Sequence, residues 1–289
     1  MVDKLNSDQT QVDLNETRNK VNEILDALNR QIIIPWSPSE IPTLAWWDAS
    51  DASTIQHTSN SVTQWNDKSG NGVNLTVPSA NAAPTINTRT LNNLNVMEYA
   101  GTNSGFRNSN FSYNRSSKSF CISFICNIIT APTNVQHFYF SGTNSVSPGK
   151  RIMARSVSSN TALQIFGGTG SSNKVVGASG LTLRTSVLIS IEFTPTGPNS
   201  AIRVNGDEKN TGDTGNNHLN YFNLGMNEGG AFSVEGFFGE CILHNDNTMI
   251  EKIEGYLAHK WGLEGSLDSA HPYKDWNAFL RSSWGYNRL

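Results

Sequence analysis

The chain has 289 residues, of which 37% are hydrophobic and only 16% charged, with a formal charge of −3. No run of Lys or Arg stands out, so the sequence predicts no nucleic-acid partner, because such binding depends on a basic face that releases counterions. It holds no apolar stretch of about 18 residues, so no membrane insertion is expected.

The N-terminal segment, from about Asp8 to Ile34, is predicted to be a helix with one apolar stripe. The stripe consists of Leu14, Val21, Ile24 and Leu28. A helix of this length is marginal in water, so the stripe has to pack either on the domain that follows it in its own chain or on copies of itself. We favour oligomerisation through these four residues as a homotrimer, with residues 1–36 as a stalk and the proline-rich residues 37–42 as a stiff spacer.

From Thr43 onward the apolar residues alternate, which predicts an all-β domain of antiparallel strands over residues 43–275. Gly-, Ser- and Asn-rich gaps separate the runs, as a β-sandwich requires. Asn205-Gly206 predicts a tight hairpin, because both residues tolerate positive φ. The runs predicted as strands are 119–129, 135–141, 162–166, 187–194, 200–204, 221–225 and 234–244.

Three cysteines do not provide a disulfide framework. Cys121 and Cys126 lie five residues apart in one predicted strand and therefore face opposite sides. We expect both, together with Cys241, to be buried free thiols.

A late helix is predicted from a capping box that spans Thr248 to Glu251. Ile250, Ile253, Leu257 and Trp261 share one of its faces, and Gly262 suits a left-handed end. The helix should cover one edge or end of the sandwich. Residues 276–289 form an aromatic C-terminal tail that we expect to dock on this chain or on a neighbour.

Three phrases connect the chain to a known family. The first two are Trp46-Trp47-Asp48-Ala49-Ser50-Asp51 and Trp65-Asn66-Asp67-Lys68-Ser69-Gly70-Asn71-Gly72. The third closes the domain as Glu254-Gly255-Tyr256-Leu257-Ala258-His259-Lys260-Trp261-Gly262-Leu263, followed by His271-Pro272-Tyr273-Lys274. They resemble the concanavalin A-like, laminin-G-type domains of bacterial surface and phage virion proteins. The resemblance implies a jelly-roll β-sandwich in a structural or surface protein, in which His259 and His271 anchor the closing segment.

The resemblance also raises glycoside hydrolysis, because laminarinase-type enzymes on this scaffold place Glu, Asp and Glu on alternate positions of one strand. No such phrase is present: Glu235 and Glu240 are five apart, Asp207-Glu208 falls in the predicted hairpin turn, and Asp268 and Asp275 fall in loops. Nucleophile elbows, phosphate loops and zinc spacings are also missing. We therefore predict that the chain is not an enzyme and has no catalytic, cofactor-binding or metal-binding residues.

One possible ion remains, since laminin-G-type modules often hold calcium at the sandwich rim. Asp48, Asp51 and Asp67 would supply hard oxygen ligands. The alternative, which we favour, is that these aspartates cap backbone amides in turns.

Sugar binding is the other small-ligand hypothesis, because the chain is rich in Asn and aromatic residues. At least two of Trp46, Trp47 and Trp65 are expected in the core, which leaves Tyr113, Tyr139 and Trp276 as candidate platforms.

The leading functional hypothesis is a non-enzymatic phage virion protein of the head-fibre, decoration or tail-fibre type. It would contact other virion proteins and glycans on the host surface. The N-terminus lacks the apolar segment of a secretory signal, which is compatible with assembly into a virus particle. The alternative is a bacterial carbohydrate-binding or adhesion module.

Overall fold

The computed structural model describes residues 14–22, 36–101, 103–130, 136–142, 152–157, 162–168, 175–178, 181–196 and 198–275. The chain divides into two units, Met1–Trp36 with Leu280–Leu289, and Ser37–Phe279. In the first unit, residues 14–22 form a helix in which Leu14 and Val21 are 59% and 47% exposed. Ile24, Leu28 and the predicted tail at 276–289 lie outside the described residues, so the predicted oligomerisation stripe stays a prediction.

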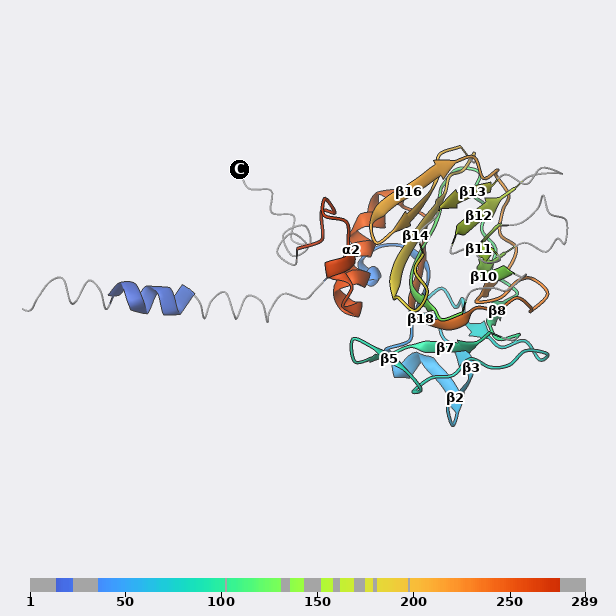
Figure 1. Cartoon of the computed structure of the whole chain (residues 1–289), viewed down its shortest axis with the longest axis horizontal. Helices are drawn as coiled ribbons and strands as arrows, with labels where there is room; N and C mark the ends of the chain where they lie inside the picture. The colour runs from blue at the N-terminus through green and yellow to red at the C-terminus, as the bar shows by residue number, and fades with distance from the viewer. Residues whose placement is uncertain are drawn as a thin grey trace, which may run out of the picture. The chain divides into compact units, whose positions relative to one another are not determined.

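The second unit is an antiparallel β-sandwich, as predicted (Figure 1). In the described residues, one sheet has the strand order β1 (Thr43–Asp48), β18 (Glu235–His244), β9 (Phe120–Ile128), β14 (Val187–Phe193), β15 (Ser200–Val204) and β16 (Asp207–Gly212), with β7 (Met97–Ala100) also paired to β18. The other has the order β13 (Val175–Ala178), β12 (Leu163–Gly167), β11 (Ile152–Val157), β10 (Gln136–Ser141), β17 (Phe222–Leu224), β8 (Phe106–Asn108), β4 (Leu75–Thr76), β3 (Ser61–Trp65) and β2 (Ile55–Thr58). A small hairpin of β5 (Thr90–Leu91) and β6 (Leu94–Asn95) lies apart.

Short helical elements complete the second unit. The 3-10 turns described are η1 (Pro38–Glu40), η2 (Ala52–Thr54), η4 (Asn247–Met249) and η5 (Glu264–Ser266), and the one α-helix described there is α2 (Ile250–Trp261). Among the described helices, none is both long enough and apolar enough to cross a membrane.

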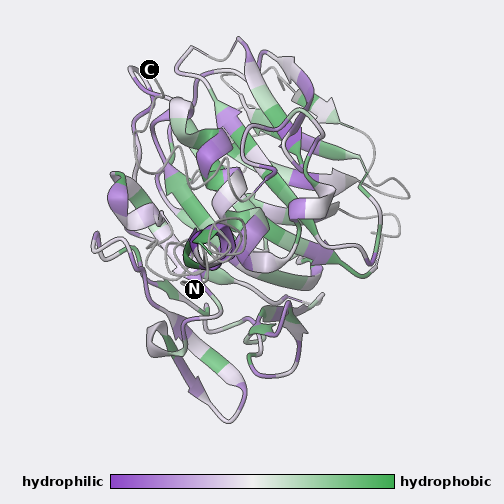
Figure 2. Ribbon diagram, turned by 90° about the vertical axis from the view of Figure 1, so that its left-hand side faces the viewer, coloured by the Kyte–Doolittle hydropathy of each residue, from purple (hydrophilic) through white to green (hydrophobic). Residues whose placement is uncertain are grey.

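The main core lies between the two sheets and is rich in aromatic side chains. Trp47 and Trp65 are fully buried and Trp46 is 6% exposed, which confirms the expectation that at least two of these tryptophans are core residues. Trp47 stacks on Phe222 of the opposite sheet, with ring centroids 5.2 Å apart. The strands carry most of the hydrophobic residues in Figure 2, whereas the loops between them are largely hydrophilic or neutral.

Helix α2 covers the outer face of the first sheet, where it packs on β9 and β14. Both faces of β9 are therefore covered, and its residues are almost continuously buried. In a strand with one face in solvent, buried and exposed residues would alternate. Cys121, Cys126 and Cys241 are buried free thiols, as predicted. Helix α2 is capped at its C-terminus by Gly262 in the left-handed conformation, with φ of 70°, which confirms the predicted helix end.

Two local predictions are wrong. The helical segment starts earlier than the Thr248 capping box, because Asp246 caps the preceding turn η4 and accepts hydrogen bonds from the Thr248 backbone and hydroxyl. Asp207 and Glu208 lie on β16 rather than in the hairpin turn. The turn itself is confined to Asn205 and Gly206, with φ of 52° and 78°, so the next residues already pair with β15.

A buried charged cluster joins the first strand, the last strand and α2. The carboxylate of Glu240 on β18 is fully buried and accepts hydrogen bonds from Lys260 Nζ at 2.6 Å, Trp46 Nε1 at 2.6 Å, Trp261 Nε1 at 2.9 Å and Tyr256 Oη at 3.0 Å. Lys260 Nζ also lies 2.7 Å from Asp48 Oδ2, and Lys68 Nζ lies 2.8 Å from the same oxygen. We refer to Asp48, Lys68, Glu240 and Lys260 as the Glu240 cluster.

The geometry of the sheet explains why this cluster needs two ammonium groups. Asp48 and Glu240 are direct cross-strand partners in the β1–β18 register, so their carboxylates are held close together. Burial and the charge of Asp48 raise the pKa of Glu240. Burial opposes ionisation of Asp48 as well, but Lys260 and Lys68 overcome it, so that the pKa of Asp48 is lowered.

A second buried ion pair anchors the closing segment. Arg203 Nε on β15 lies 3.0 Å from Glu254 Oε1 on α2, and His271 Nε2 lies 3.1 Å from Glu254 Oε2. His259 Nε2 lies 2.9 Å from the backbone oxygen of Tyr273. These contacts agree with the anchoring role predicted for the two histidines.

We predict that Glu240→Gln lowers the free energy of unfolding by about 3 kcal/mol, because the amide NH2 of Gln cannot accept the hydrogen bonds that Glu240 Oε2 takes from Lys260 and Trp261. The matched control is Lys209→Met, which removes the exposed ion pair with Asp207 and should cost less than about 1 kcal/mol. Urea denaturation of both variants checks the difference. Equal losses would show that the Glu240 cluster contributes no more than a surface ion pair.

Candidate functional site

The three aspartates predicted as calcium ligands or turn caps lie in two neighbouring turns. Asp67 Oδ1 accepts hydrogen bonds from the backbone N–H of Trp46 at 2.9 Å and of Ser69 at 2.8 Å. Its Oδ2 accepts from Ser69 Oγ at 2.8 Å and from the Val73 N–H at 3.1 Å. Both oxygens of Asp67 thus accept hydrogen bonds, from donors in its own turn and from the backbone of β1.

The other two aspartates bind donors of the same kind. Asp48 Oδ1 accepts from Ser50 and Asp51 Oδ1 accepts from Ser53, while the second oxygen of each faces Lys68. A calcium ion would have to displace these N–H and ammonium groups, so the arrangement fits turn caps and does not fit a calcium site. No group of three metal-binding side chains occurs within the part of the chain that the structure describes.

A polar pocket lies at one end of the first sheet, where four neighbouring strands begin or finish. β1 and β9 begin at this end and β14 and β18 finish there, because neighbouring strands in the sheet are antiparallel. The connecting segments therefore meet although they are far apart in sequence. They line a pocket of about 420 Å³ with Pro42, Ser117, Lys118, Ser119, Pro195, Asn245, Asp246 and Asn247, which we call the strand-end pocket.

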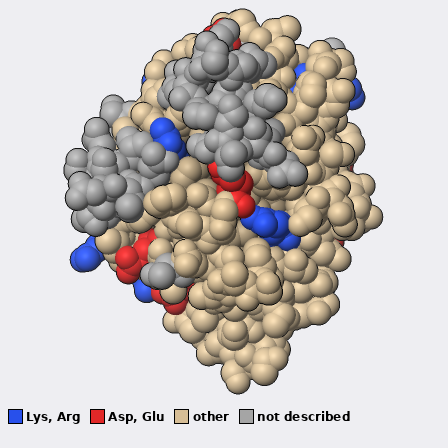
Figure 3. Space-filling model, turned by 90° about the vertical axis from the view of Figure 1, so that its right-hand side faces the viewer, with Lys and Arg blue, Asp and Glu red and all other residues tan. Residues whose placement is uncertain are grey.

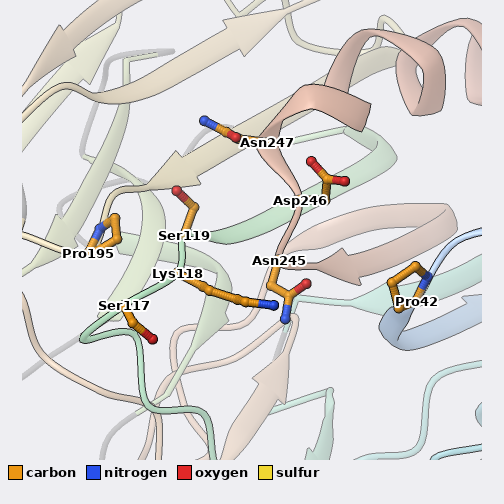
Figure 4. Close-up of a pocket in the computed structure, with 8 residues that line it drawn as sticks. All are labelled: Pro42, Ser117, Lys118, Ser119, Pro195, Asn245, Asp246 and Asn247. Atoms are coloured by element: carbon orange, nitrogen blue, oxygen red, sulfur yellow. The ribbon is translucent and has the colours of Figure 1, made fainter.

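The strand-end pocket combines several polar groups on a framework of strand ends. Figure 4 shows the Lys118 side chain extending toward Asn245, with Pro195 and Pro42 on opposite sides. Glu192 at the end of β14 accepts hydrogen bonds from Ser119 Oγ at 2.6 Å and from Asn247 Nδ2 at 2.9 Å. Two of the lining side chains are thus held in place by one carboxylate behind them.

Behind the pocket lies a buried imidazole. The His244 side chain is fully buried, and its Nδ1 lies 2.9 Å from the backbone oxygen of Asp246. Burial lowers the pKa of His244 to about 4, against the opposing effect of Asp246. The neutral ring therefore supports the 245–247 turn at neutral pH.

The predicted aromatic platforms have different positions. Tyr139 is 1% exposed and lies in the core, so its prediction as a platform is wrong: a bulge in β10 places both Tyr139 and the adjacent Phe140 in the core between the sheets. Tyr113 is half-buried and donates its hydroxyl to the Ser119 backbone oxygen at 2.9 Å, next to the strand-end pocket. Trp276 lies outside the described residues.

The residues of the pocket were not predicted from the sequence as a site. One signal was present, because the run Asn245-Asp246-Asn247 follows the predicted strand 234–244 directly. Its partners at 117–119 and 195 carry no motif and can be placed beside it only by the strand order.

Lys and Arg are sparse and mixed with acidic residues on the face shown in Figure 3.

Comparison with known proteins gives the fold. No protein-family model matches the chain, and no curated protein matches it. Among solved structures, the binding domain of botulinum neurotoxin serotype D has a TM-score of 0.53 and 10% identity over 76% of this chain and 51% of that chain. Trypanosoma rangeli sialidase in complex with sialic acid has a TM-score of 0.51 and 11% identity over 86% of this chain and 39% of that chain.

These similarities define a class by fold alone. The chain is an antiparallel β-sandwich of a kind that occurs in a neurotoxin binding domain and in a sialidase that was solved with sialic acid. It spans from 31% to 53% of the length of the matched structures. At these identities the likeness shows the fold alone.

The comparisons contradict the prediction that the chain is not an enzyme. Trypanosoma rangeli sialidase occurs repeatedly among the matched structures. One of these structures is a covalent intermediate with 2,3-difluorosialic acid, at a TM-score of 0.50 and 10% identity over 81% of this chain and 37% of that chain. The missing Glu, Asp and Glu phrase excludes one type of hydrolase, and enzymes with this fold do not all depend on it. The absence of the Glu, Asp and Glu phrase therefore does not exclude catalysis by this chain.

We predict that stability falls as the pH is lowered from 7 to 5, partly through His244. Between its ordinary pKa of 6.5 and about 4, the unfolded chain binds a proton on this imidazole that the folded chain does not. The loss at this residue is about 2 kcal/mol between pH 7 and pH 5, and His244→Asn should remove it. Urea denaturation at both pH values measures it, with His57→Asn on the exposed part of β2 as control. An unchanged pH dependence in His244→Asn would contradict the assignment.

Proposed function

We propose that this chain is a glycan-binding module and that the strand-end pocket is its binding site. The observation that carries the proposal is the composition of the pocket: residues that bear two hydroxyls, two amides, a carboxylate and an ammonium group line one space of about 420 Å³. Sugars are recognised by such groups, because each ring hydroxyl both donates and accepts hydrogen bonds.

The charged groups of the pocket favour an acidic sugar. Lys118 is exposed at the rim and supplies a cation for a carboxylate, and Asn245 beside it supplies an amide. The sialic acid in one structure of the same fold is a sugar of this chemistry, which supports its choice as the first probe.

We predict that Lys118→Ala and Asn245→Ala each weaken glycan binding roughly tenfold, equivalent to about 1.4 kcal/mol. The measurement is a glycan array that includes sialylated and neutral oligosaccharides, followed by calorimetric titration of the best ligand. Lys209→Ala on β16 serves as a control with the same change of charge. Binding that is equally strong in all three variants would rule out the strand-end pocket. A fluorogenic sialoside added to the same samples reports any cleavage.

We further propose that the module is displayed on the surface of a phage particle as a homotrimer, together with other virion proteins. Two observations support this proposal. The opening and closing phrases resemble those of phage virion proteins, and Leu14 and Val21 leave apolar surface on a helix that is too short to be stable alone. In this proposal the helix joins the copies and the sandwich contacts glycans of the host.

We predict that Leu14→Glu with Val21→Glu converts the oligomer to a monomer, because it places charges in the contact between helices. Asn15→Glu with Asn22→Glu makes the same change of charge one residue further along the helix and should leave the oligomer intact. Light scattering gives the mass of both variants. A wild-type monomer would contradict the stalk, and absence of the chain from purified phage particles would contradict the location.

A further inference from the structure

The segment between β17 and β18 presents an aromatic ring to solvent. Among the large hydrophobic residues described in the sandwich, only Phe232 is exposed, with 46% of its surface accessible. Its backbone has φ of 53°, in the left-handed region that aromatic residues seldom occupy. Neither property favours folding, and residues held in a strained backbone conformation cluster at functional sites.

The segment that carries Phe232 is braced on several sides. Asn81 Nδ2 donates to the backbone oxygens of Gly230 at 2.5 Å and Asn103 at 2.8 Å, Arg107 Nη2 to that of Glu228 at 2.6 Å, and the Ala231 N–H to Asn227 Oδ1 at 2.8 Å. The oxygen of Phe232 itself accepts from the Phe138 N–H at 3.0 Å. The loop is thus fixed before any ligand arrives, which lowers the entropic cost of binding.

One side of the Phe232 ring packs against the outer face of the second sheet. Tyr139 and Ile152 point into the main core, so the alternate residues Phe138 and Met153 point outward, where they form a small buried cluster with Phe166. The rings of Phe138 and Phe232 lie 6.3 Å apart at an angle of 33°. This support leaves the remaining surface of Phe232 for a ligand.

The size and surroundings of the exposed ring indicate what it binds. A stable protein interface buries roughly 800 Å² on each partner, far more than one ring surrounded by polar backbone can offer. A pyranose ring matches it, because one face of the sugar presents C–H groups and its edge presents hydroxyls. The half-buried Asn227 lies in the same loop; its Oδ1 accepts from the Ala231 N–H, and its amide NH2 is a donor for those hydroxyls.

We propose that Phe232 is a stacking platform for a neutral pyranose, in a site separate from the strand-end pocket. The pocket follows the end of β18 at His244, whereas Phe232 precedes its start at Glu235. The strand has ten residues and is about 30 Å long, so the two sites lie at opposite ends of it. The site extends the proposed glycan-binding function but does not depend on the pocket.

Saturation-transfer NMR on the full chain tests the platform, with methyl β-D-glucopyranoside and methyl β-D-galactopyranoside as probes. The wild type should transfer saturation preferentially to the C–H groups of one ring face. Phe232→Asn removes the ring and suits the left-handed backbone, and it should weaken binding roughly tenfold. Phe232→Tyr keeps the ring and should bind as the wild type does. Lys118→Ala should change nothing, even if it abolishes binding to the strand-end pocket.

The proposal is overturned by no saturation transfer to either sugar, by unchanged transfer in Phe232→Asn, or by loss of transfer in Lys118→Ala. Thermal unfolding of each variant confirms that it is folded, so a loss of binding in folded Phe232→Asn with retention in Phe232→Tyr supports the platform. Loss of binding in both folded variants contradicts it.

Discussion

The buried carboxylate of Glu240 is the group on which the arrangement of the sandwich depends. It lies on β18, is paired in register with Asp48 on β1, and receives hydrogen bonds from Lys260 and Trp261 on helix α2, which follows β18 in the chain. Removing two carboxylates and two ammonium groups from water is costly, and only the complete set of partners offsets this cost. The cluster therefore specifies one relative position of β1, β18 and α2, and with it the strand ends that form the pocket.

The same cluster explains why the most informative phrases of the sequence concern architecture. The opening phrase supplies Trp46, Asp48 and the turn that Asp67 caps, and the closing phrase supplies Lys260 and Trp261. Periodicity predicted the strands and the late helix because burial acts on each element locally. The Asn205-Gly206 hairpin and the Gly262 helix end followed from backbone conformations that few residues adopt.

The candidate sites could be predicted much less well. The strand-end pocket combines side chains from four segments whose meeting is determined by strand order, which local patterns do not contain. Tyr139 and Phe232 show the same limit: a bulge in β10 buries Tyr139, and a left-handed backbone conformation accompanies the exposure of Phe232. The fold does not exclude catalysis either, because the same kind of sandwich occurs in a neurotoxin binding domain and in a sialidase.

The central functional claim is that glycan binds at the strand ends held in place by the Glu240 cluster. A crystal structure of the chain with the oligosaccharide that binds most tightly in an array tests it most directly. The account predicts electron density for an ordered sugar between residues 117–119 and 245–247, with hydrogen bonds to Lys118 and Asn245. A sugar bound elsewhere, with this pocket filled only by solvent, would contradict it.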